Sequence, residues 1–176
     1  SYLGQLVVML FQFISAGCGI AIAVVVFKAM KEEATIKLGN FYFLFLRACT
    51  RILLPISLVV ALLLVFNGTP MTFEGKESIT NLQGDTVQVS RGPVAAFVAI
   101  KHLGTNGGGF FGPNSAHPFE NPSYFTNIVE IITQMLIPIA MIFALGYILK
   151  RRNLSWMIFG VMTIGFLLLT IPTILS

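Results

Sequence analysis

The sequence predicts an all-α integral membrane protein, in which a transmembrane helix, a re-entrant pore loop and a second transmembrane helix form a repeat with flanking transmembrane helices. Composition is the first reason: 56% of the 176 residues are hydrophobic and 10% are charged, whereas a soluble domain carries about 25% charged residues. The second is a set of apolar runs long enough to cross a hydrocarbon core about 30 Å thick, which takes about 20 helical residues. The third is a glycine-rich string that follows an apolar segment too short to cross.

The first apolar run, residues 3–27, contains no charged residue and predicts one transmembrane helix. It is too long for the apolar region of a signal peptide and has no basic flank before it, so we expect it to belong to the mature protein. A polar link through Gly39 and Asn40 follows it. Cys18 and Cys49 lie in or beside apolar runs, a placement that indicates neither a disulfide framework nor a metal site.

The second spanning helix is expected over about residues 44–66. The aromatic stretch 41–43 in front of it is typical of a membrane interface. Arg47 and Arg51 are four residues apart and therefore share one face of the first turns, where long side chains can extend back to water. Pro55 predicts a kink in this helix.

Residues 67–91 are polar and predict an aqueous loop, in which the alternation of residues 86–90 indicates a short hairpin. Apolar, helix-forming residues return over 93–103, and Pro93 suits the first helical position. Eleven helical residues span about 16 Å, roughly half a bilayer. This segment therefore cannot cross the membrane.

A glycine string and a polar stretch occupy residues 104–122, and the helix expected over 125–149 is long enough to cross completely. A half-helix, a glycine loop and a return to the starting side make a re-entrant hairpin. The basic residues of 150–153 end that helix. Residues 154–175 then predict a fourth spanning helix with Trp156 at its interfacial start.

The distribution of basic residues predicts the orientation. Eight of them would lie on one side of the membrane and three on the other, and the side with the larger number is expected in the cytoplasm. The glycine loop would then enter from the extracytoplasmic side. The larger group is Lys28, Lys31, Lys37, Arg47, Arg51, Lys150, Arg151 and Arg152, and the smaller is Lys76, Arg91 and Lys101.

The glycine string carries the functional hypothesis. Irregular backbone inside lipid has unpaired N–H and C=O groups, and it persists only where something polar satisfies them. Glycine admits positive φ, so residues 104–109 can turn successive carbonyls toward one axis, where the oxygens replace the water shell of a cation. The C-terminal dipole of the half-helix also favours positive charge. Neutral carbonyls suit K⁺, which sheds water more easily than smaller ions of the same charge, so the hypothesis is a potassium filter.

Other interpretations of the glycines stay open. Gly107 and Gly109 could permit close helix packing, or the string could be an external turn, although packing glycines recur at helical spacing and these are consecutive. Residues 107–112 also match G-x-G-x-x-G, but the dinucleotide pattern needs a strand before it and a helix after it. Here a helix is predicted before the string and Pro113 follows it. We therefore expect neither a nucleotide nor a nucleic acid as a ligand.

Several polar residues lie near the string. Glu130, in the second turn of the long helix, is expected to face a cavity or a partner, with an interfacial position as the alternative. Lys101 and His102 complement the dipole at the end of the half-helix, or Lys101 reaches toward the pore as a resident cation. Four further residues are expected to brace the loop rather than hold a metal, since no second His or Cys lies near them: Asn114, His117, Glu120 and Asn121.

The string GTNGGGFFGPNSAHPFENP, residues 104–122, closely resembles the second filter loop of the potassium-binding, channel-like subunit of Kdp-type potassium-transporting ATPases, the KdpA family. The motifs GTNGGGFF and NS-x-HPFENP occur together and in order. Residues 92–104 and the LGN at 38–40 also look like this family, so the resemblance covers essentially the whole chain. One departure is Gly112-Pro113, where the family pattern commonly has Asn-Ala; it concerns the outer turn and not the filter glycines.

The resemblance implies membership of the superfamily of potassium transporters, in which four non-identical repeats surround one filter. It implies K⁺ as the transported ion and no organic cofactor. Its implied partners are a catalytic P-type ATPase subunit and smaller accessory subunits, in the lipid bilayer of a bacterial inner membrane. No D-K-T-G-T phosphorylation motif is present, so we do not expect this chain to be the enzyme. One quarter of the filter would come from Thr105, Asn106, Gly107, Gly108 and Gly109.

A single filter loop supplies only part of a carbonyl ring, so one copy should not conduct. Either four copies assemble or the chain is a fragment of a longer protein that contains the remaining repeats, and the resemblance favours the fragment. Residues 1–40 would then end the preceding repeat, 41–149 would form the repeat with the loop, and 150–176 would open the next. Two other functions stay open: a passive K⁺ channel or cation-coupled transporter subunit of the same superfamily, and a membrane scaffold without an ion site.

Overall fold

The computed structural model describes residues 2–31, 39–80 and 82–175 and confirms the predicted helical membrane architecture. Residues 32–38, most of the predicted polar link, lie outside this description. The elements are α1 (Tyr2–Lys31), α2 (Phe41–Arg47), the π-helical turn η1 (Ala48–Leu53), α3 (Leu54–Phe66), β1 (Lys76–Thr80), β2 (Thr86–Ser90), α4 (Val94–Gly104), α5 (Tyr124–Ile148) and α6 (Arg152–Leu175). Four described helical segments are long and apolar enough to cross a membrane: Leu3–Lys31, Phe41–Phe66, Tyr124–Ile148 and Arg152–Leu175.

A π-helical turn, η1, lies just before Pro55, the residue at which the sequence predicts a kink. Proline has no N–H to donate, and its ring crowds the carbonyl of the preceding turn. The backbone therefore opens just before it, and the Leu54 N–H donates to the carbonyl of Cys49, five residues earlier. At the start of this span the Asn40 side chain accepts the Phe43 N–H at 3.2 Å and caps α2.

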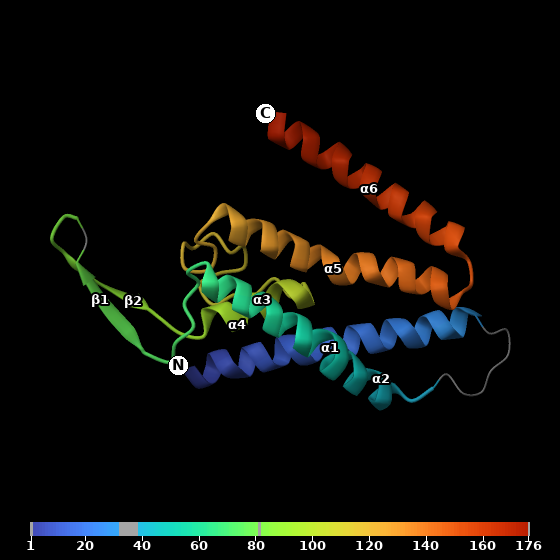
Figure 1. Ribbon diagram of the computed structural model, residues 1–176, viewed down its shortest axis with the longest axis horizontal. Coiled ribbons are helices and arrows are strands. Elements are labelled where there is room, and N and C mark those ends of the chain that lie inside the picture. Colours follow the sequence, from blue (N-terminus) through green and yellow to red (C-terminus); the bar gives the residue numbers. More distant parts are fainter. Residues whose placement is uncertain (1, 32–38, 81, 176) are drawn as a thin grey trace.

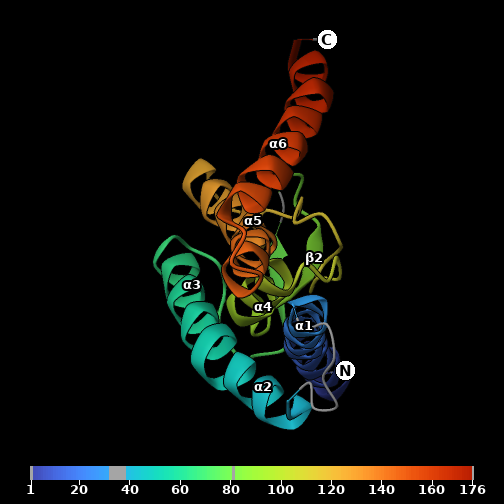
Figure 2. The same ribbon diagram turned by 90° about the vertical axis from the view of Figure 1, so that its right-hand side faces the viewer.

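The short helix α4 is enclosed on all sides, because it packs against α1, α3 and α5 (Figures 1 and 2). The first seven residues of α4, 94–100, are all apolar, and a helical segment that is apolar all round needs cover all round. Val60 and Leu64 of α3 cover its first turns. Residues of α1 and η1 pack on Leu103 at its end. Its buried residues are Val94, Ala95, Phe97, Val98, Ala99, Lys101 and Leu103.

The hairpin predicted in the polar loop is present. Strands β1 and β2 pair antiparallel, with Thr80 opposite Thr86 next to the turn. The two strands project from one end of the helical body (Figure 1). Most of their side chains are exposed, and an ion pair between Arg91 and Glu77 ties the end of the hairpin to its first strand.

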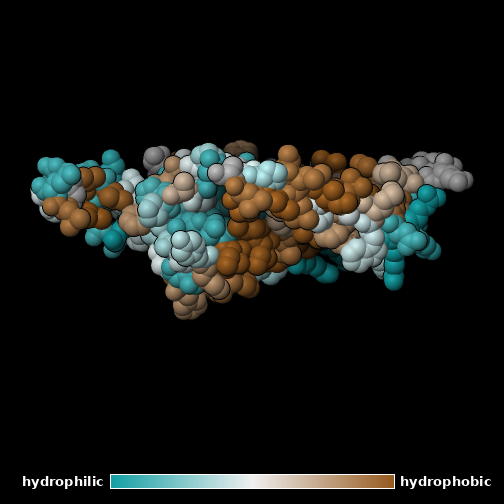
Figure 3. All heavy atoms as spheres, turned by 90° about the horizontal axis from the view of Figure 1, so that it is seen from above, coloured by the Kyte–Doolittle hydropathy of each residue, from teal (hydrophilic) through white to brown (hydrophobic). Residues whose placement is uncertain are grey.

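The arrangement of the ends agrees with a re-entrant loop. Figure 1 shows the start of α1, the hairpin and the start of α5 at one end, and the α5–α6 turn at the other. The chain enters the bundle through α4 and returns to the same end before α5 begins (Figure 1). In Figure 3 hydrophilic surface gathers at both ends, with hydrophobic surface between them. Helix α6 leans away from the other helices (Figure 2).

Close packing of α1 on the second span gives a first prediction. A Cβ added at Gly17 would collide with Cys49 Sγ and lie 3.0 Å from the Phe45 ring, whereas one added at Gly19 meets nothing within 4 Å. We expect Gly17→Ala to destabilise the full-length parent protein by about 1–3 kcal/mol through overpacking. Gly19→Ala should be neutral or slightly stabilising, because alanine favours helix. Thermal unfolding in detergent measures both, and equal melting temperatures for the two variants would contradict the packing described here.

Candidate ion site

The glycine string begins beside the middle parts of α1 and α5, and one side of it is open, because Thr105 and Gly107 are exposed. A pocket of about 260 Å³ at the end of α4 is lined by Thr105 and Asn106, by α1 residues from Ser15 onward, and by Ile137 and Met141 of α5. These residues of α1 and α5 lie near the middle of helices that are 30 and 25 residues long. The start of the string is therefore far from the aqueous ends of both spans.

The backbone leaves α4 through a Schellman motif. The Thr105 N–H donates to the His102 carbonyl and the Asn106 N–H to the Lys101 carbonyl, both at 3.1 Å. Thr105 has φ 52° and Gly107 has φ 76°. From the sequence, glycine is expected to supply the positive φ in this string. Gly107 does so, but the other residue with positive φ is Thr105. A β-branched residue is strained in the left-handed region, and such strain persists where the surroundings impose it.

Helix α1 contacts the string through two polar side chains. Gln12 Nε2 donates to the Gly108 carbonyl at 3.1 Å. Asn106 Nδ2 donates to Ser15 Oγ at 2.9 Å. These contacts join residues more than 90 positions apart in the sequence, so the string is attached to a helix distant from it along the chain.

A buried ion pair holds the segment that follows the string. Lys101 Nζ lies 2.8 Å from Glu120 Oε2, and the two side chains are 2% and 0% exposed. The second carboxylate oxygen, Oε1, accepts the Phe111 N–H at 2.8 Å. Lys101 also donates to Ser115 Oγ. Lys101 thus faces the loop and an acid that balances its charge, instead of lying unpaired in a pore.

The ion pair favours the ionised form of Glu120 and leaves no room for a side chain at Gly109. Burial alone raises the pKa of the Glu120 carboxyl, but hydrogen bonds from Lys101, Phe111 N–H and Ser115, with the Lys101 charge, outweigh it and hold that pKa below its ordinary value. A Cβ added at Gly109 would lie 2.9 Å from both Glu120 Oε1 and Lys101 Nζ and would collide with the Gly112 carbonyl. Gly109 therefore permits close approach within the loop, not packing between helices.

The residues expected to brace the loop differ in what they contact. The His117 ring stacks on Phe111 with centroids 3.8 Å apart, and its Nδ1 accepts the Phe119 N–H. The Asn121 side chain bonds to Thr126 and Asn127 at the start of α5. Asn114 is exposed, and its side chain makes no hydrogen bond within the part of the chain that the structure describes. A bracing role for these residues stays a prediction.

Glu130 faces a partner on the half-helix. Its Oε2 lies 2.9 Å from His102 Nε2, and the side chain is 4% exposed. The same His102 nitrogen lies 3.0 Å from Ser115 Oγ, and His102 Nδ1 lies 3.4 Å from Gln134 Oε1. The other Glu130 oxygen, Oε1, is buried without a hydrogen-bond partner among the described residues. The pair links the end of α4 to α5.

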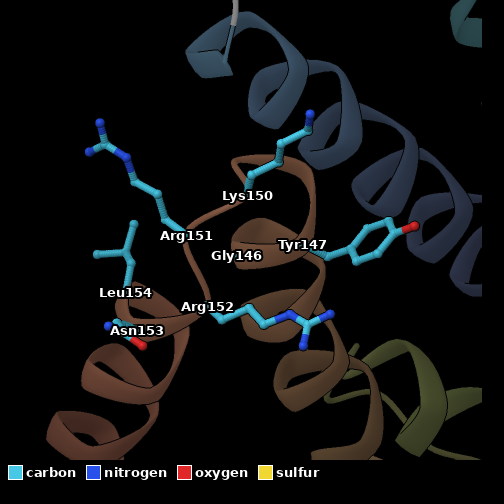
Figure 4. Close-up of a pocket in the computed structure, with 7 residues that line it drawn as sticks. All are labelled: Gly146, Tyr147, Lys150, Arg151, Arg152, Asn153 and Leu154. Carbon is cyan, nitrogen blue, oxygen red and sulfur yellow. The ribbon is translucent and has the colours of Figure 1, made fainter.

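A second pocket, of about 640 Å³, lies at the α5–α6 turn. Lys150, Arg151 and Arg152 line it, and their side chains fan out in different directions (Figure 4). Three adjacent cations disfavour a cation ligand there. Within residues 2–31, 39–80 and 82–175 no group of three His, Cys, Asp or Glu side chains is placed to hold a metal ion.

Sequence reasoning missed the contacts made by Gln12 and Ser15 and the pairings of Lys101 and His102. A weak signal was present, because Gln12 is an uncharged polar residue within a long apolar run. The partner of such a residue depends on which helices pack together, which local pattern does not show. Of the four residues predicted to brace the loop, Glu120 binds the backbone just after the glycines, because its carboxylate accepts the Phe111 N–H.

The fold and the loop define a class of protein: a polytopic membrane protein with a half-helix and an irregular, glycine-rich loop beside its spanning helices. The family model described as "KdpA: Potassium-transporting ATPase A subunit" matches residues 1–176. The chain belongs to this family, as the resemblance of its loop predicted.

Curated relatives agree with the family match. The chain is 68% identical over 176 residues to a potassium-transporting ATPase potassium-binding subunit from Flavobacterium psychrophilum, and 67% identical to the one from Flavobacterium johnsoniae. It is 43% identical over 165 residues to that of Geobacillus kaustophilus. These alignments cover 100%, 100% and 94% of this chain but 31%, 31% and 29% of the relatives. The chain thus spans about three tenths of their length.

The buried ion pair gives a second prediction. Removing one partner leaves an uncompensated buried charge, so Lys101→Met in the full-length parent protein should cost about 3–5 kcal/mol of stability. The double variant Lys101→Met, Glu120→Leu should cost less than the sum of the single changes, because it leaves no unpaired charge. Glu77→Gln breaks an exposed pair as a control and should cost about 1 kcal/mol or less. Additive losses in thermal unfolding would show that the two charges are not coupled.

Proposed function

We propose that this chain supplies one loop of a potassium filter, in which backbone carbonyls of Thr105, Asn106, Gly107, Gly108 and Gly109 provide the ligands that bind and select K⁺. The observation that carries the proposal is irregular, glycine-rich backbone at the C-terminal end of a half-helix enclosed by apolar spans. Carbonyls at this depth lack bulk water, and the helix dipole favours a cation there. The names of the relatives, potassium-binding subunits, support K⁺ as that cation.

One loop is only part of such a site. A dehydrated ion needs oxygen ligands on all sides, and this chain offers one glycine string of this kind. The chain covers 31% of the length of its relatives. We therefore propose that further loops of a longer parent chain complete the ring, with residues 1–40 ending one repeat, 41–149 forming the next and 150–176 opening a third.

Energy for uptake would come from a partner. The relatives are named as subunits of a potassium-transporting ATPase, and these 176 residues contain no D-K-T-G-T phosphorylation motif. We propose a non-catalytic role, in which the parent chain assembles with a catalytic P-type ATPase subunit and smaller accessory subunits in a bacterial inner membrane. The eight basic residues expected on one side support a cytoplasmic location for the α5–α6 turn and an extracytoplasmic entrance for the loop.

Gly107 provides the test of the filter. Its φ of 76° is unfavourable for residues with a Cβ, yet an added Cβ meets no atom within 4 Å, so Gly107→Ala perturbs the backbone without a collision. We expect this variant to lower the preference for K⁺ over Na⁺ in uptake by about tenfold while the amount of inserted protein stays the same. Gly112→Ala is the control, since Gly112 has neither positive φ nor a close neighbour. An unchanged ion preference in Gly107→Ala would count against the filter.

Orientation is tested by cysteine labelling of the assembled full-length protein. Leu82→Cys places a thiol in the hairpin turn, where Leu82 is fully exposed, and Asn153→Cys places one in the first turn of α6, where Asn153 is exposed. A membrane-impermeant reagent added outside should label the first variant in intact cells, and should label the second only after the membrane is opened. The reverse pattern would show that the loop enters from the cytoplasm.

A further inference from the structure

Gln12 and Ser15 of α1 are polar side chains in an otherwise apolar span. The run of residues 3–27 carries no charge, and a primary amide that faces hydrocarbon loses its hydrogen bonds. Gln12 turns inward, where it is 9% exposed, and its Nε2 keeps a hydrogen bond there, while its Oε1 is buried without a partner among the described residues. The residues that it meets there belong to the glycine string.

The contacts form a compact set. Gln12 Nε2 donates to the Gly108 carbonyl at 3.1 Å. The Ser15 hydroxyl donates to the Gln12 carbonyl at 2.9 Å, which leaves its oxygen free to accept from Asn106 Nδ2 at 2.9 Å. Asn106 Nδ2 also lies 3.4 Å from the Gln12 carbonyl. One turn of α1 thus binds a side chain and a backbone carbonyl of the string.

The approach of α1 to the string is close. A Cβ added at Gly108 would lie 2.7 Å from Gln12 Nε2, and one added at Gly104 would lie 3.2 Å from the Ala16 side chain. Glycine at these two positions therefore lets the helix reach the loop. Gly107 lies between the two bonded positions. It has positive φ, and no atom lies within 4 Å of the place that its Cβ would occupy.

We propose that Gln12 and Ser15 are positioning residues for ion selection: by tying the Gly108 carbonyl and the Asn106 side chain to α1, they fix both ends of the short segment whose middle is Gly107. The inference rests on the proposed potassium filter and adds residues from the helix that precedes the repeat. The Gly108 carbonyl is then bonded to α1, so this inference narrows the ligand set of the proposed filter: Gly108 belongs to the contact with α1, and the ion ligands lie before it, at Thr105, Asn106 and Gly107. A Cβ added at Gly108 would displace the Gln12 amide, so glycine at this position serves the contact with α1.

The test compares two α1 variants in the full-length parent protein, assembled with its partner subunits. Gln12→Leu removes the donor at similar volume, and Ser15→Ala removes the acceptor. We expect the ratio of apparent affinities for K⁺ and Na⁺ to fall by about three- to tenfold in each, the range that follows from the loss of one hydrogen bond. The maximal rate at saturating K⁺ should change less. Gln5→Leu is the matched control, because Gln5 lies two helical turns earlier on the same face and makes no hydrogen bond to the string as described.

The ion ratios of the three variants separate the role of α1 from the filter itself. A fall in the ion ratio for Gln12→Leu and Ser15→Ala, with melting temperature and protein amount equal to those of Gln5→Leu, supports positioning. An unchanged ratio in both variants, while Gly107→Ala lowers it, overturns the role of α1 and leaves the filter intact. Loss of discrimination in the unmodified protein would instead contradict the proposed filter. If Gln12→Leu fails to accumulate, Ser15→Ala decides, and an unchanged ratio in that variant overturns the inference.

Discussion

The need to satisfy backbone polar groups away from bulk water governs the structure around the loop. The end of α4 meets this need through a Schellman motif, in which Thr105 and Asn106 donate to carbonyls of the last turn. The Phe111 N–H is taken by a carboxylate, and the Gly108 carbonyl by Gln12. Under the proposed function, the carbonyls between these anchors are left for an ion. Protein groups thus hold the loop on both sides of the segment that we propose as the ion site.

Charged side chains are buried around the end of α4, away from bulk water. A carboxylate is a strong acceptor for a backbone N–H, but a buried one needs a compensating cation. The adjacent residues Lys101 and His102 face two acids, Glu120 in the loop and Glu130 on α5, and Ser115 contacts both basic side chains. The end of the half-helix is therefore connected through polar contacts to the loop and to a spanning helix at once.

Most of the fold could be predicted from the sequence, because run length and polarity decide which segments cross a bilayer. The four spans, the half-helix and the hairpin all lie within a few residues of their predicted bounds. The partners within the site could not be predicted. The contact of Gln12 with Gly108 joins α1 to a loop residue 96 positions away in the sequence, so it depends on how the helices pack. The positive φ at Thr105 depends on how the chain leaves α4. Local pattern indicates where the backbone is irregular, but packing decides what satisfies it.

Under the proposed function, carbonyl oxygens of the string replace the hydration water of an alkali ion. Bound ions can be located in the full-length protein assembled with its partners, by the anomalous signal of Tl⁺ or Rb⁺ exchanged for K⁺. We expect a peak within ligand distance of the carbonyls of residues 105–107, and loss of that peak when excess K⁺ is restored. Oxygens of this segment that point away from any peak, in an assembly that still takes up K⁺, would contradict the proposed function.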